Sequence, residues 1–157
     1  MSKKAVAILL TLGILMAGAG IVNAATLSIT ANVSSSVTLA LDPSSFTFDG
    51  VQPGVASAPQ ELTATTTGSD VLYNLQLSST AFTTAGSSHS ASTLQYKPTA
   101  SGTYVSASGT ATNMMTASSV ADSDGDAKTF DLRVNFPSSA NNGTYAATVT
   151  ITATPSL

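Results

Sequence analysis

Hydrophobic and polar residues alternate one by one over several stretches of this chain after residue 24. The clearest stretches are 27–33, 129–136 and 145–154. In the last of them, the odd positions from Tyr145 to Ala153 are apolar, and the even positions are alanine or threonine. Because neighbouring side chains of a strand point to opposite faces, this spacing predicts strands with one buried face.

Shorter runs with the same character lie between these stretches, and turn signals such as Asp42-Pro43 and Asn141-Asn142-Gly143 separate them. The shorter runs cover residues 37–41, 46–48, 61–67, 73–77, 94–97 and 103–106. The Ser/Thr/Ala-rich interval from Thr83 to Thr93 is expected to be a long hairpin loop. No stretch after residue 24 has helical periodicity with caps. We therefore predict an all-β fold, an antiparallel Ig-like β-sandwich of roughly eight strands that spans residues 25–157 as one domain.

The first 24 residues have the three-part order of a secretory signal peptide. Lys3 and Lys4 are followed by residues 5–20, which carry no charge, and then by Val22-Asn23-Ala24, with small or short residues at the cleavage positions. We expect cleavage after Ala24 and export. A permanent membrane helix is disfavoured because the apolar core is shorter than the ~20 residues that a bilayer requires. A prepilin-type cut near Lys4, which retains the apolar segment, is the competing possibility.

Composition narrows the partners of the predicted domain. Charged residues make up only 8 % of the chain, against ~25 % in ordinary soluble domains, whereas 43 % of the residues are hydrophobic, which favours a packed core. The predicted domain has three basic residues, Lys97, Lys128 and Arg133, against Glu61 and seven aspartates. Without a basic patch, nucleic acid and anionic membrane surfaces are not expected partners. The chain has no cysteine, so its stability must come from burial, strand pairing, bound ions or assembly.

Two local motifs resemble those of secreted surface proteins. A Phe-x-Phe-x-Gly segment (Phe46 to Gly50) and a Pro53-Gly54 turn precede a Leu-x-Ala-x-Thr strand, and Asn-Gly-Thr-Tyr precedes the last alternating strand. The sequence thereby resembles the Ig-like sandwiches of bacterial and archaeal surface proteins, including pilin-like filament subunits and WxL-type wall proteins. That resemblance implies an extracellular structural role. The chain has no tryptophan, so the Trp-x-Leu motifs of the wall-binding proteins are missing.

The strongest candidate site is Asp122-Ser123-Asp124-Gly125-Asp126. Carboxylates at alternate positions around a glycine can converge on a hard cation, so we predict a Ca²⁺ site formed by Asp122, Asp124 and Asp126. An EF-hand is excluded because its frame would place Ala127 and Arg133 where a glycine and a glutamate are needed. The alternative is a solvated acidic turn between two strands.

Candidate catalytic groups are few, and we interpret the protein as a non-enzyme without a small-molecule substrate. His89 is the only histidine, and its serine neighbours do not by themselves supply the geometry of a catalytic triad. Four tyrosines could form a sugar-binding platform, although their spacing on alternating strands favours core packing. They are Tyr73, Tyr96, Tyr104 and Tyr145. Asn32 and Asn142 both lie in N-glycosylation sequons.

Two functions follow from these observations. The first is a non-catalytic structural subunit of an extracellular filament or surface layer, which self-associates by β-strand addition through residues 25–33. That segment contains no Lys, Glu or Pro that would protect an exposed sheet edge. The alternative, which the sequence favours over exchange, is that this segment is the first strand of its own sandwich. The second function is a calcium-dependent adhesin, or a module that binds carbohydrate or cell wall, with a cell-surface glycan as partner.

Overall fold

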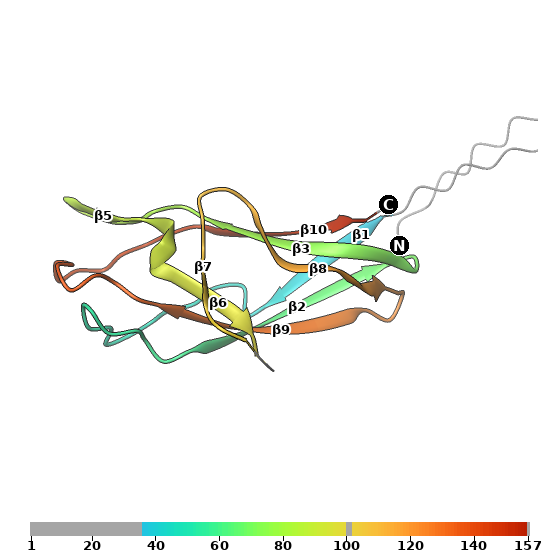
Figure 1. Cartoon of the computed structure of the whole chain (residues 1–157), viewed down its shortest axis with the longest axis horizontal. Helices are drawn as coiled ribbons and strands as arrows, with labels where there is room; N and C mark the ends of the chain where they lie inside the picture. The colour runs from blue at the N-terminus through green and yellow to red at the C-terminus, as the bar shows by residue number, and fades with distance from the viewer. Residues whose placement is uncertain (1–35, 100–101, 157) are drawn as a thin grey trace, which may run out of the picture. The chain divides into compact units, whose positions relative to one another are not determined.

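The alternating stretches pair into two antiparallel sheets in a computed structural model that describes residues 36–99 and 102–156. The first sheet has the order β1-β2-β9-β6-β7, and the second has the order β10-β3-β8 (Figure 1). The strands of the first sheet are β1 (Val37–Asp42), β2 (Gln60–Gly68), β9 (Asp126–Val134), β6 (Leu94–Pro98) and β7 (Val105–Ser106). Those of the second are β10 (Val149–Pro155), β3 (Val71–Ser79) and β8 (Thr112–Ala121). A separate hairpin joins β4 (Phe82–Thr84) to β5 (Ser87–His89), and one 3-10 turn, η1, covers Ala91–Thr93.

The inner faces of the two sheets form the core. Along β3 every second residue is buried, and the same period runs through β2 and the second half of β9. The largest fully buried side chains include Tyr73, Leu62, Leu75, Leu77, Leu94, Leu132 and Val134. Because the two antiparallel sheets bury mostly apolar alternate positions of β2, β3, β6 and β9 between them, the predicted antiparallel β-sandwich is confirmed.

The structure differs from the expected strands in four places. Residues 46–48 are not a strand, and the last strand begins at Val149 rather than at Tyr145. Strand β8 was not expected, because the alternation of its sequence is weak. The expected loop from Thr83 to Thr93 contains most of the β4–β5 hairpin and η1.

The predicted leader (1–24) and the predicted strand 25–33, with Asn32, lie outside the described residues. Within the described parts of the chain, no helix has the length and hydropathy of a membrane span.

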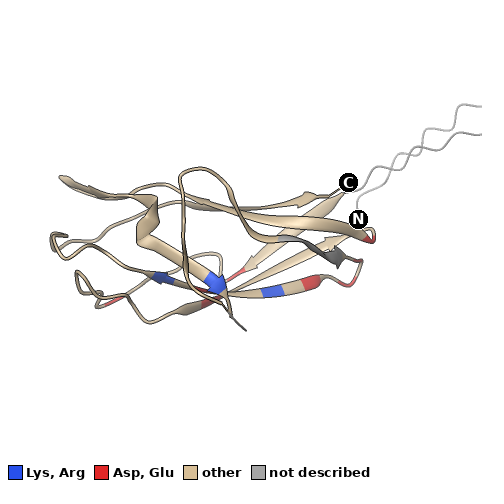
Figure 2. Cartoon of the chain, in the orientation of Figure 1, with Lys and Arg blue, Asp and Glu red and all other residues tan. Residues whose placement is uncertain are grey.

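Charged side chains are unevenly distributed between the two sheets (Figure 2). All three basic residues of the described domain lie in β6 and β9. Lys97 pairs with Asp131 across these strands at 3.2 Å, and the guanidinium of Arg133 lies 3.6 Å from the ring centroid of Tyr104. By contrast, β3 and β10 contain no charged residue, and their outward positions carry threonine, serine, asparagine and glutamine together with the exposed Leu72 and Val149.

Candidate functional site

Of the predicted calcium ligands, Asp122 and Asp124 lie in the turn between β8 and β9 and Asp126 is the first residue of β9; Asp122 has a structural role in the turn. Its Oδ1 accepts hydrogen bonds from the backbone N–H groups of Asp124 and Gly125 at 3.0 and 2.8 Å. Gly125 has φ +92°, and a Cβ there would lie 3.0 Å from Cγ2 of Thr65 on β2. The aspartate and the glycine of the motif are therefore both explained by the turn itself.

Asp126 points into the sandwich rather than toward the turn. Its Oδ2 accepts a 2.8 Å hydrogen bond from the hydroxyl of Tyr73, a fully buried residue of β3, and its Oδ1 lies 2.9 Å from Nζ of Lys128. Burial, followed by the interaction with the Asp126 carboxylate, raises the pKa of Tyr73 to about 12. This Tyr73–Asp126–Lys128 chain ties the two sheets together at one end of the sandwich.

The three aspartates therefore do not converge. Asp122 and Asp124 are exposed in the turn, whereas the carboxylate of Asp126 has partners from β3 and β9. Over residues 36–99 and 102–156, no three His, Cys, Asp or Glu side chains are grouped closely enough to hold a metal ion. The calcium site stays a prediction without support from this geometry.

His89 lies in β5, where its ring packs against Phe136 and Tyr145 with centroid distances of 5.5 and 5.1 Å. Its Nε2 is buried and has no hydrogen-bond partner among the described residues. The four tyrosines do not form a common platform. Tyr73 and Tyr96 are buried in the core, as the strand spacing predicts, whereas Tyr104 lies under Arg133 and Tyr145 lies beside Phe136.

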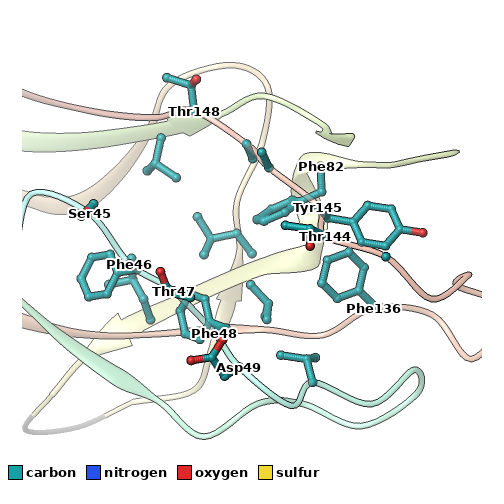
Figure 3. A pocket seen from close by; sticks show the side chains of 18 of the residues that line it. Ser45, Phe46, Thr47, Phe48, Asp49, Phe82, Phe136, Thr144, Tyr145 and Thr148 are labelled. Atoms are coloured by element: carbon teal, nitrogen blue, oxygen red, sulfur yellow. The ribbon is translucent and has the colours of Figure 1, made fainter. Parts of the chain in front are cut away.

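An apolar groove, which we call the edge groove, opens between the two sheets (Figure 3). One wall is the segment 43–51 that follows β1, and the other is the segment 140–149 that leads into β10. Its floor consists of core side chains, which are Leu62, Leu94, Leu132 and Val134. The groove has a volume of about 780 Å³, and Asp49 is the only charged residue that lines it. The groove is open to solvent and leaves these core side chains accessible from one side of the sandwich.

Aromatic rings close one end of the edge groove. Phe82 meets Phe136 edge to face at 5.6 Å, and Phe136 lies 4.9 Å from Tyr145. The Tyr145 hydroxyl donates to the backbone oxygen of Asn141 at 3.1 Å. On the opposite wall, Phe46 and Phe48 stack at 6.2 Å and are half-buried, and Gln60 Nε2 donates to the oxygen of Thr47 at 2.6 Å. The walls are thus fixed to the sandwich on both sides.

The main chain along the second wall is only half paired. Ala146 exchanges two hydrogen bonds with Thr83, and the oxygen of Thr148 accepts from the N–H of Thr80. These bonds use the side of the strand that faces β3 and β4. Because successive backbone groups of an extended segment point to opposite edges, Tyr145 and Ala147 direct theirs the other way. No residue of the described chain forms a backbone hydrogen bond with either of them.

The edge groove could not be predicted from the sequence, although the segments that form its two walls carry strand-like patterns. The Phe46-x-Phe48 pattern and the alternating row from Tyr145 were each predicted to be paired strands. The groove forms because, among the described residues, Phe46 and Phe48 form no backbone–backbone hydrogen bond and the segment from Tyr145 is paired along one edge only, which local patterns cannot reveal. A comparison with protein-family models and with curated protein sequences finds no family and no relative that matches this chain.

Proposed function

We propose that this protein is a non-catalytic structural protein of the cell exterior, a subunit of a surface filament or surface layer, and that it assembles by β-strand addition. The observation that carries this proposal is the edge groove. It combines an apolar floor with main-chain groups at Tyr145 and Ala147 that have no backbone partner among residues 36–99 and 102–156, which are the two features that an added strand requires.

Two further features support an assembling protein. Among the strands that the structure describes, β1 pairs only with β2 and β10 only with β3, and β1 and β10 contact each other, so the edges of both sheets that these strands leave open lie on the same side of the sandwich. Neither β1 nor β10 contains a lysine, and the residues that can protect a sheet edge, Asp42 of β1 and Pro155 of β10, lie at the last position of each strand. The signal-like leader supports export of the chain.

Electron microscopy of the purified protein in negative stain tests the proposal directly. Assembly by strand addition predicts unbranched polymers or ordered layers, because a donated strand makes a heterologous contact that does not close on itself. A deletion of residues 25–33 is expected to abolish the polymers. Monodisperse particles at every concentration and ionic strength would contradict the proposed function.

A further inference from the structure

We propose that the edge groove is the acceptor site for residues 25–33 of a second copy of this chain. This inference rests on the proposed function and deepens it, because it names the segment that is donated, the place where it docks and the residues that hold it there.

The segment and the groove match in chemistry. Residues 25–33 carry an apolar side chain at every second position, which are Leu27, Ile29, Ala31 and Val33, with small polar residues between them. A strand with this pattern turns one apolar row toward the groove floor of Leu62, Leu94, Leu132 and Val134. The segment contains no charged residue that would lose its hydration on entering the groove.

The backbone of the groove is also prepared for a strand. The main-chain groups of Tyr145 and Ala147 point away from β3 and β4 and lie in line with the open edge of β10. A strand added there would extend the order β10-β3-β8 by one member. On the facing wall, no described residue forms a backbone–backbone hydrogen bond with Phe46 or Phe48. An incoming strand therefore finds donors and acceptors to pair with as well as apolar surface.

The position of β1 favours a second copy over the same copy as the donor. β1 and β10 are in contact, and the start of β1 lies beside the end of β10 (Figure 1). The groove opens beyond Leu41, at the far end of β1. The nine residues of the segment extend over about 30 Å. To fill its own groove, the segment would have to reverse before Val37 and run back past β1, between two strands that already touch.

The aromatic end of the groove sets how far the donated strand can advance. Phe82 packs edge to face against Phe136, and Phe136 packs at a tilt against Tyr145, so three ring side chains are gathered at this end of the groove. A strand that enters from the open end is therefore halted at this cluster, which defines one register for the four apolar side chains.

Disulfide trapping tests the inference, because the chain has no cysteine of its own. Full-length protein with Leu27→Cys, Ile29→Cys or Ala31→Cys serves as the donor and is mixed under oxidising conditions with Ala147→Cys, the acceptor. We expect a covalent dimer with at least one donor position, which also identifies the register. The control acceptor, Ala127→Cys, lies exposed on β9 outside the groove and should give no dimer. Equal cross-linking to both acceptors, or none to Ala147→Cys, would overturn the inference.

The same cysteines decide which copy donates. A chain that carries both the successful donor cysteine and Ala147→Cys should form covalent multimers at high concentration. A disulfide within a single monomer, at every concentration, would show that the chain fills its own groove and would refute donation between copies.

A blocking substitution separates this inference from the proposed function. Ala147→Trp fills the groove, so this variant should lose sedimentable polymer, whereas the matched variant Ala127→Trp should polymerise like the unmodified protein. Because Ala147→Trp keeps an intact donor segment, adding it to unmodified protein should shorten the polymers by capping them. If unmodified protein forms no polymer, the proposed function fails. If Ala147→Trp polymerises normally, the acceptor site is wrong and the proposed function stands.

Discussion

Replacing Tyr73 by phenylalanine tests the link between the two sheets. The substitution keeps the buried ring and removes the hydroxyl that donates to Asp126 Oδ2 at 2.8 Å. A hydrogen bond to a charged group contributes about 1.5–3 kcal/mol to the free energy of unfolding. For a domain of this size, a loss near the middle of that range lowers the melting temperature by roughly 5 to 10 °C.

The pH dependence of this effect gives a second, independent signature. The pKa of Tyr73 is raised from 10.0 to about 12 in the folded protein, mainly by burial and then by Asp126. Below pH 10 the hydroxyl is protonated in both states, and its stabilising contribution is complete. Above pH 10 the unfolded chain ionises first, so the contribution declines until pH 12. A difference of two pH units corresponds to a decline of the order of 3 kcal/mol.

Urea unfolding at pH 7 and at intervals from pH 9 to pH 12 measures both effects. The advantage of the unmodified protein over Tyr73→Phe should be largest at neutral pH and should shrink toward zero by pH 12. Tyr96→Phe is the matched control, because Tyr96 is also buried but its hydroxyl makes only longer contacts, at 3.3 Å to Thr112 Oγ1 and 3.5 Å to the oxygen of Asn113. Equal stability of Tyr73→Phe and the unmodified protein at pH 7, with parallel pH profiles, would refute this account.

Three further predictions concern the acidic turn and the leader. Asp122→Ala removes both hydrogen bonds to the turn and should lower the free energy of unfolding by about 1 kcal/mol. Asp122→Asn keeps an acceptor oxygen and should lower it less. Equal losses of the two variants in chemical denaturation would argue against the hydrogen-bonding role of Asp122. If Ca²⁺ binds at the turn, a chelator should lower the melting temperature of the unmodified protein but not that of Asp124→Ala, and an unchanged melting temperature in both would exclude the site. Intact-mass analysis of native material should give a chain that begins at Ala25, and a species that retains residues 5–20 would show that the prepilin-type alternative is correct.

The alternating stretches predicted the sheets because burial on one face requires that pattern. Residues 61–67 and 73–77 lie within β2 and β3, with the apolar positions turned inward. β8 was not predicted because its sequence includes a Thr-Ala-Ser-Ser run without alternation of apolar and polar residues. Its pairing with β3 is also irregular, with register shifts near Leu75. The β4–β5 hairpin was missed because its short strands are held by ring packing around His89 and Phe136 from distant parts of the chain.

The candidate site was harder to predict than the fold. The acidic motif at 122–126 has a ligand-like spacing, yet strand β9 begins at Asp126 and turns that carboxylate toward Tyr73, which is distant in sequence. The edge groove depends on two segments with strand-like sequences, of which residues 46–48 form no strand and the segment from Tyr145 is paired along one edge only within the described chain. Both outcomes are set by long-range packing, which a single-sequence pattern does not contain.

The placement of the basic residues has a consequence for proteolysis. Apart from Lys3 and Lys4 of the predicted leader, the lysines and arginine of this chain are Lys97, Lys128 and Arg133, and all three lie in strands β6 and β9. Proteases nick folded proteins at exposed loop tips, and none of the described loops offers a basic residue. An enzyme that cuts after lysine or arginine can therefore enter the domain only when the first sheet itself opens. Its rate of cleavage would report the global opening of the sandwich rather than the local motion of a loop.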